Sequence, residues 1–283
     1  MQIAYDTFGG EVGKKYDSKK PSGQRSCANA IGYGKAVFSH GICGGRMGKR
    51  HRRHHRKIGD FMKFAYPAID AVFDAEDEKV NTLVIENPSL LYALLEDLGS
   101  QMEGMNGDAV VSENGTVLRT DKNAELLTQF FPFELNKKPL LNKIASELER
   151  TALHGEFYAE SMELVAAIEA FLLKLSFDIS CDVSYTKLDI GSIIKSAGIE
   201  INDDKTSLCE RIVDYMELVT AFDRKKLFVT VNLRGFVPDK EMNLFLKTVK
   251  GHGFSLLMIE NHEYPLLEME KRTIVDSDLC LIC

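Results

Sequence analysis

The sequence of 283 residues contains no apolar run that approaches the ~20 residues needed for a membrane-spanning helix. Its first ten residues, MQIAYDTFGG, also lack the apolar segment of a secretory signal peptide. These two absences argue against a membrane protein and against a secreted one. We therefore expect a protein of the cytoplasm.

Cysteine is scarce, and its spacing is irregular. Six cysteines do not form the regular pattern of a small disulfide-linked domain, so we expect reduced thiols. Cys280 and Cys283 make one CxxC pair, but no second pair completes a zinc site. The last four residues, CLIC, match the loose prenylation pattern without the basic segment that should precede it, and we discount that modification.

The glycine-rich phosphate loop of nucleotide-hydrolysing enzymes, GxxxxGK[ST], is also missing. Residues 81–86 (NTLVIE) predict a strand, and leucines at helical spacing over residues 90–98 predict a helix. Only Asn87, Pro88 and Ser89 separate the two. Because no run of backbone amides and no lysine is available there to hold a phosphate, we predict no ordinary NTPase activity and no nucleotide cofactor.

The formal charge of −7 conceals two oppositely charged parts. Residues 1–61 hold 13 Lys and Arg against 4 Asp and Glu, a net of +9. The other 222 residues hold 22 against 38, a net of −16. A body this acidic does not attract nucleic acid as a whole, so DNA binding would require its basic side chains to be gathered on one surface.

Residues 1–61 are rich in glycine and basic residues and have no sustained apolar periodicity, which predicts disorder. The run at residues 49–57 (KRHRRHHRK) could bind phosphates, although with little specificity. His40, Cys43, His51 and His54 do not match the spacing of a standard zinc finger. We interpret these four as an accidental cluster.

Met62 offers another explanation for this segment. Gly59 and Asp60 can be encoded by GGAGAY, which resembles a bacterial ribosome-binding sequence at a suitable distance from a start codon at Met62. We favour the hypothesis that residues 1–61 are a translated leader outside the native protein, over a functional basic arm. Codons without a GGAG-like run would remove the reason for it.

A strand-helix-strand unit dominates the C-terminal part. Residues 227–231 (LFVTV) and 254–259 (FSLLMI) are almost wholly apolar, as expected of strands buried on both faces of a parallel sheet. Between them, Pro238 suits a first helical turn, and apolar residues recur at helical spacing up to Gly251. Polar residues such as Glu260 follow the second strand, where such sheets usually bind ligands.

Other elements surround this unit. Asn114-Gly115 predicts a tight hairpin, residues 126–133 and 278–282 are predicted strands, and Ser207 opens a capped helix. Further helices are expected from Pro139, over residues 157–175 and over residues 188–197. The resulting order predicts an α/β head at residues 62–135 and 223–283, with an all-helical extension inserted at residues 136–222.

Three segments resemble a known family: NKKP at residues 136–139, IIKSAGI at 193–199 and RKKLFVTVN at 224–232. With the element order, they are similar to the ring-forming accessory protein of type II-A CRISPR adaptation, over roughly residues 62–283. The resemblance implies a degenerate P-loop-NTPase-like head with a mostly parallel sheet and helical legs. It also implies a non-catalytic homotetrameric ring that holds double-stranded DNA ends beside the CRISPR integrase and the effector nuclease.

The resemblance also implies binding residues. A basic inner wall would be formed by Arg119, Lys122, Lys137, Lys138, Lys143 and Lys195. Calcium would support the ring, and the acids available for it are Asp178, Asp182 and Asp189. Ser184, Thr186 and Ser192 stand where further acids are expected, so this sequence departs from the family pattern there.

Two other functions stay open at this stage. A metal-dependent nuclease or nucleotide-cleaving enzyme could use Glu86 and Glu260 at strand ends to hold magnesium, although no histidine base or phosphate-binding lysine follows a recognisable pattern. A structural adaptor that binds only proteins would need no DNA surface. Linear DNA incubated with magnesium tests the first alternative, and gel filtration with duplex tests the second.

Overall fold

The computed structural model describes residues 62–75, 77–181 and 183–282. The segment 1–61, with its basic run, its His and Cys residues and Gly59-Asp60, lies outside the described residues, as do Asp182 and Cys283. The expectations for those residues therefore stay expectations.

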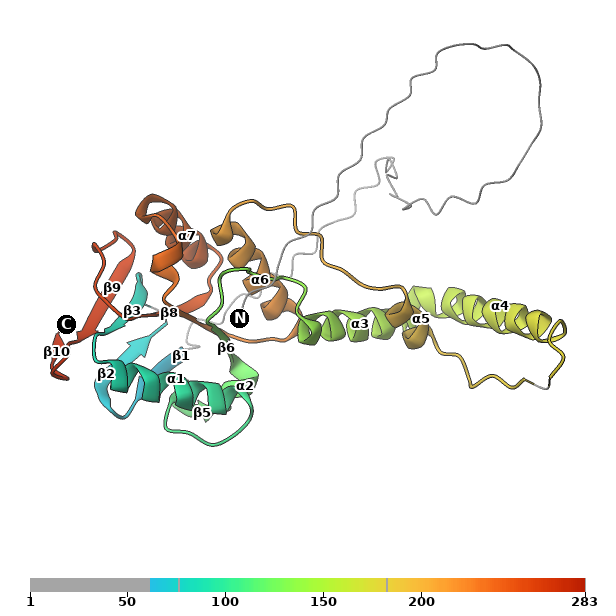
Figure 1. Cartoon of the computed structure of the whole chain (residues 1–283), viewed down its shortest axis with the longest axis horizontal. Helices are drawn as coiled ribbons and strands as arrows, with labels where there is room; N and C mark the ends of the chain where they lie inside the picture. Colours follow the sequence, from blue (N-terminus) through green and yellow to red (C-terminus); the bar gives the residue numbers. More distant parts are fainter. Residues whose placement is uncertain (1–61, 76, 182, 283) are drawn as a thin grey trace, which may run out of the picture. The chain divides into compact units, whose positions relative to one another are not determined.

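A six-stranded sheet forms the centre of the fold (Figure 1). Its order is β10-β9-β3-β8-β7-β6, and all neighbours are parallel except β9 and β10. This confirms the α/β fold class with a mostly parallel sheet. The strands are β3 (Val80–Ile85), β6 (Ala124–Leu127), β7 (Leu227–Val231), β8 (Ser255–Glu260), β9 (Glu270–Val275) and β10 (Leu281–Ile282).

The three central strands are buried on both faces. Every residue of β3, β7 and β8 is buried, which is why their sequences are continuous apolar runs instead of alternating ones. Phe228 and Met258 face one core, and their neighbours Val229 and Leu257 face the other. Burial on both faces fixes the register, because a shift by one residue would exchange the two cores.

A smaller antiparallel sheet has the order β2-β1-β4-β5. Its strands are β1 (Met62–Tyr66), β2 (Ile69–Asp74), β4 (Val110–Glu113) and β5 (Thr116–Leu118). Asn114 and Gly115 both have positive φ, 52° and 77°, as a type I′ turn requires, and the predicted hairpin is confirmed. Phe64 and Phe73 of this sheet pack into the core shared with α1 (Pro88–Met102).

The opposite core is covered by α6 (Leu208–Phe222) and α7 (Asp239–Gly251). Met242, Phe245, Leu246 and Val249 of α7 are buried at the predicted spacing, so the strand-helix-strand unit is confirmed. Ser207 caps α6 by accepting the Glu210 amide. Although α6 lies within residues 136–222, its apolar face belongs to the same core as the sheet.

Three further helices separate β6 from α6 in the chain: α3 (Lys138–Ala152), α4 (Tyr158–Ser176) and α5 (Ile190–Ser196). Helix α3 contacts both α5 and α6. Gly191 lets α5 approach closely, because a Cβ there would lie 2.5 Å from Cδ of Glu149. Short segments complete the list: α2 (Thr120–Asn123), η1 (Gly155–Phe157) and η2 (Leu233–Phe236).

Several strand predictions were wrong in extent. The strand expected at residues 126–133 ends at Leu127, because Phe130 and Phe133 leave the sheet to pack in the core beside α6. Of the described residues 278–282, only Leu281–Ile282 form a strand. Strands β1, β2 and β9 were not predicted, and β9 carries three charged residues in its EKRTIV sequence.

None of the helices in the described residues combines the length and the apolar character that a membrane span requires.

Candidate nucleic-acid interface

A groove between α3 and the C-terminal end of α6, called the α3 groove below, brings three basic side chains together. It has a volume of about 310 Å³, and Lys143, Arg150 and Arg224 line it together with Glu147. Lys143 and Arg150 are seven residues apart in α3 and therefore share one helix face. Arg224 comes from the turn that follows α6. The groove thus joins residues that are far apart in the sequence.

Two of these three cations are paired with acids. Nζ of Lys143 lies 3.0 Å from Oδ1 of Asp223, and Nε of Arg150 donates to Oε2 of Glu147 at 2.9 Å. The hydrogen bonds from Arg150 hold the pKa of Glu147 below its usual range. Arg224 acts on Glu147 only through a longer-range attraction and has no ion pair in the part of the chain that the structure describes. With three cations and two acids, the groove is positively charged.

Lys137 lies in a different setting, over aromatic rings. Its Nζ is 4.4 Å from the centre of the Tyr215 ring, and the Tyr215 hydroxyl donates to Oε1 of Glu125 at 2.6 Å. Lys225 binds the other oxygen of Glu125, also at 2.6 Å. Burial lowers the pKa of Lys137, and the charge of Lys225 acts in the same direction. Lys137 is therefore held by the protein, whereas the neighbouring Lys138 is exposed.

The remaining predicted DNA-binding residues are exposed but dispersed. Lys195 lies on α5, which packs on α3. Arg119 and Lys122 belong to the region of α2, whose neighbours are α1, β4 and β6, and both pair with Asp121. The structure thus brings the α3 and α5 residues to neighbouring helices, and it places Arg119 and Lys122 among other elements.

Sequence reasoning missed Arg150 and Arg224. Arg150 could have been found, because it stands seven residues after Lys143 and helical periodicity puts both on one face. Arg224 carried no such signal, since its place beside α3 depends on how α6 packs.

Of the three acids expected to bind calcium, the structure describes Asp178 and Asp189. Asp189 caps α5, and its two oxygens accept the amide and the hydroxyl of Ser192, each at 2.8 Å. These hydrogen bonds lower its pKa. Asp178 follows the end of α4. No group of three or more His, Cys, Asp or Glu able to hold a metal occurs in the described ranges. Asp178 and Asp189 alone do not supply the about six to eight oxygens that calcium prefers, and calcium binding stays a prediction.

The junction of β3 and α1 is closed by protein contacts. The Asn87 side chain accepts the Leu90 amide at 3.0 Å, which caps α1, and its Nδ2 donates to the Ser277 carbonyl at 2.9 Å. The Glu86 amide donates to the Val275 carbonyl at 2.9 Å. The polar groups of this junction are therefore hydrogen-bonded to the end of β9 and to the residues that follow it.

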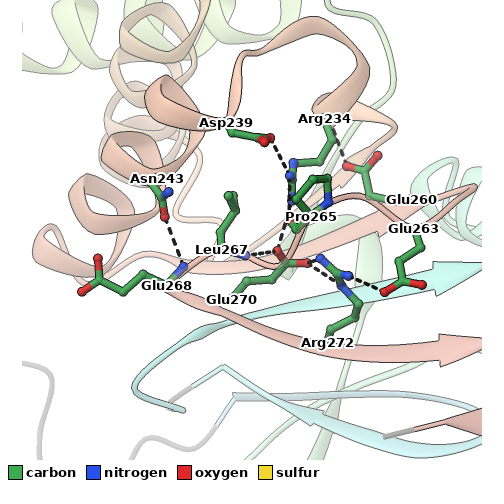
Figure 2. A network of polar contacts seen from close by, with 10 residues as sticks. All are labelled: Arg234, Asp239, Asn243, Glu260, Glu263, Pro265, Leu267, Glu268, Glu270 and Arg272. Carbon is green, nitrogen blue, oxygen red and sulfur yellow. Dashed lines mark hydrogen bonds and ion pairs between the residues drawn. The ribbon is translucent and has the colours of Figure 1, made fainter.

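A buried ionic network has Arg234 of η2 at its centre (Figure 2). Nη1 of Arg234 lies 3.1 Å from Oε2 of Glu270, its Nη2 lies 2.8 Å from Oδ1 of Asp239, and its amide donates to Oε1 of Glu260 at 3.1 Å. Arg272 joins Glu270 to Glu263 (Figure 2). Burial raises the pKa of Glu260 to about 7, and the charge of Glu270 adds to this.

Helix α4 has an unusual surface for an exposed helix. Large apolar side chains lie on several of its faces, and Ser161 is the one buried residue of this fully described helix. A helix that is apolar all round normally lies inside a protein. The exposed members are Tyr158, Met162, Leu164, Phe171, Leu173 and Leu175, with Phe177 just beyond the helix.

Comparisons with known proteins give the family of this chain. Two solved structures align with the chain: an ATP-binding cassette of an ABC transporter in its ADP conformation, and a nucleotide-free ATP-binding cassette from an ABC transporter. The identities are 11% and 13%, the TM-scores 0.35 and 0.34, and each alignment covers 72% of this chain and 82% of the other. At these scores the likeness carries no argument about fold or activity. The Cas_Csn2 profile, described as a CRISPR-associated protein, matches residues 101–279, and the chain belongs to this family.

Proposed function

We propose that this chain binds double-stranded DNA, especially its ends, as a non-catalytic homotetrameric ring during CRISPR spacer acquisition in the cytoplasm. Its partners there are the CRISPR integrase and the effector nuclease. Membership of the Cas_Csn2 family is consistent with this role. The observation that carries the proposal is the exposed apolar surface of α4, because such a surface is expected to be covered by other protein.

Assembly into a ring would also explain how an acidic subunit can bind DNA. Residues 62–283 carry a net charge of −16, so a single copy repels a duplex over most of its surface. A ring of copies can turn the exposed Lys138 and Lys195, together with the α3 groove, toward one shared passage. Binding of this kind depends on phosphate contacts and is indifferent to sequence.

A nuclease is the less favoured alternative. Glu260 is 1% exposed and its carboxyl accepts the amide of Arg234, whose guanidinium is also buried. The buried positive charge of Arg234 would repel a divalent metal ion from the Glu260 carboxyl. Asp189 already accepts two hydrogen bonds from Ser192, and these would compete with binding of a calcium ion.

The test measures molar mass in solution by sedimentation equilibrium, with and without a short linear duplex. We expect a tetramer that binds the duplex at low salt and releases it as salt rises, with a log-log slope of about −0.9 for each phosphate that is bound. Linear DNA incubated with magnesium or manganese should stay intact. A monomer that binds duplex equally well at every salt concentration would contradict the proposal, and cleavage products would support the nuclease.

A further inference from the structure

Arg224 occupies a backbone position that favours glycine. Its φ is 59°, and it directly follows Asp223, the C-cap of α6. Residues after a helix C-cap often adopt this left-handed conformation, and glycine is preferred there because it has no Cβ. The Arg224 side chain is exposed and lines the α3 groove. Neither backbone preference nor core packing accounts for an arginine at this position.

We propose that the α3 groove binds a phosphate of the DNA backbone, with Arg224 as its main ligand and Arg150 and Lys143 beside it. The inference rests on the DNA binding proposed above and names the groups that would carry it. A guanidinium offers two parallel N–H donors that match two phosphate oxygens. Arg224 has no ion pair among the described residues, so the two parallel N–H donors of its guanidinium are available to a phosphate.

The other groove residues complete the site. Glu147 accepts from Nε and Nη2 of Arg150, which orients that guanidinium. Asp223, which directly precedes Arg224 in the chain, holds Lys143 at 3.0 Å. Because three cations face two acids, one bound phosphodiester of charge −1 would neutralise the groove.

The test compares Arg224→Gly with the wild-type protein in duplex binding over a range of salt concentrations. We expect the variant to bind about tenfold more weakly at low salt, the loss typical of one charged hydrogen-bonding group, with the slope reduced by about 0.9 for each phosphate that the variant no longer binds. Its melting temperature should rise, because glycine relieves the positive φ. A loss of binding combined with a gain in stability is not expected of a structural role.

Two control variants distinguish the effect of a lost positive charge from the effect of relieved backbone strain. Lys240→Ala removes an exposed cation on α7 and should leave the slope unchanged. Asn114→Gly relieves another positive φ, 52° in the β4-β5 hairpin, and should raise the melting temperature without affecting binding. Arg150→Gln should weaken binding in the same direction as Arg224→Gly.

Several results would overturn the inference. Wild-type protein that binds no duplex would refute both this inference and the proposed function. Duplex binding that is equal in wild type and in both groove variants would refute the groove alone. Calorimetry with inorganic phosphate gives a third outcome: heat that Arg224→Gly abolishes, with duplex affinity unchanged, would assign the groove to free phosphate instead of DNA.

Discussion

The guanidinium of Arg234 and the carboxylate of Glu270 form an ion pair at 3.1 Å, and both side chains are 1% exposed. Glu270 also accepts the Leu267 amide at 3.1 Å and Nε of Arg272 at 3.0 Å. One arginine thus joins η2, the start of α7 and the strand β9.

Arg234→Met should destabilise the fold by about 3 kcal/mol, because it leaves Glu270 buried with one cation fewer. The measurement is chemical denaturation followed by far-UV circular dichroism. Lys247→Met is the matched control, since Lys247 pairs with Glu268 on the exposed face of α7, and it should change stability little. Equal effects of the two substitutions would mean that the buried network contributes no more than a surface pair.

Glu260 makes stability depend on pH. Its pKa is raised to about 7 in the folded protein, against an ordinary value of 4.5, so the folded state holds the proton more tightly than the unfolded state. This stabilisation is complete below the unfolded value and is lost as the pH rises through about 7. A shift of this size corresponds to about 3 kcal/mol at most.

Glu260→Gln should abolish the loss of stability that occurs in the wild type as the pH rises through about 7. The amide oxygen of glutamine can still accept the Arg234 N–H, and no charge appears as the pH rises. Unfolding free energies measured between about pH 5 and 8 should fall more steeply for wild type than for the variant. Taking the difference between the two curves cancels the titration of other groups, and parallel curves would show that Glu260 titrates normally.

Lys137 and Lys138 are neighbours with different surroundings, and their variants should differ accordingly. Lys137→Ala removes the cation over Tyr215 and should lower stability by about 0.5–1 kcal/mol. Lys138→Ala should leave the melting temperature unchanged and reduce the salt slope of DNA binding by about 0.9 for each phosphate that is released. A Lys138→Ala variant that loses stability, or a Lys137→Ala variant that changes only DNA binding, would contradict these two roles.

Leu173→Asp on α4 should disrupt assembly without unfolding the head. Leu173 is 56% exposed in the single chain, so the substitution acts only where another copy covers it. Leu244→Asp on α7 is the matched control, at 65% exposure. Sedimentation should show a smaller particle for the first variant and an unchanged one for the second. If both keep the wild-type mass, α4 is not part of the interface.

The sequence predicts the elements whose burial is complete. LFVTV and FSLLMI have no polar alternation, so they could be recognised as strands covered on both faces. Strand β9 could not, because Glu270, Lys271 and Arg272 give it the composition of a surface segment. Their charges are compatible with a strand only because distant residues pair with them, such as Arg234 with Glu270 and Asp77 with Lys271.

The residues of the candidate interface also differ in how far the sequence predicts their positions. Lys143 was expected to face DNA, and the structure places it in the α3 groove with Arg150. Arg224 is brought to the same groove by the packing of α6 against α3, which joins positions that no local pattern relates. Lys137 has the same charge as Lys138, and only the fold reveals that Tyr215 lies beneath it.

The apolar surface of α4 has a consequence for how the protein responds to heat and dilution. If its leucines and phenylalanines are covered only by sister chains, association and folding share one equilibrium. The temperature at which the protein melts would then rise with its concentration, and dilute samples would melt at lower temperatures.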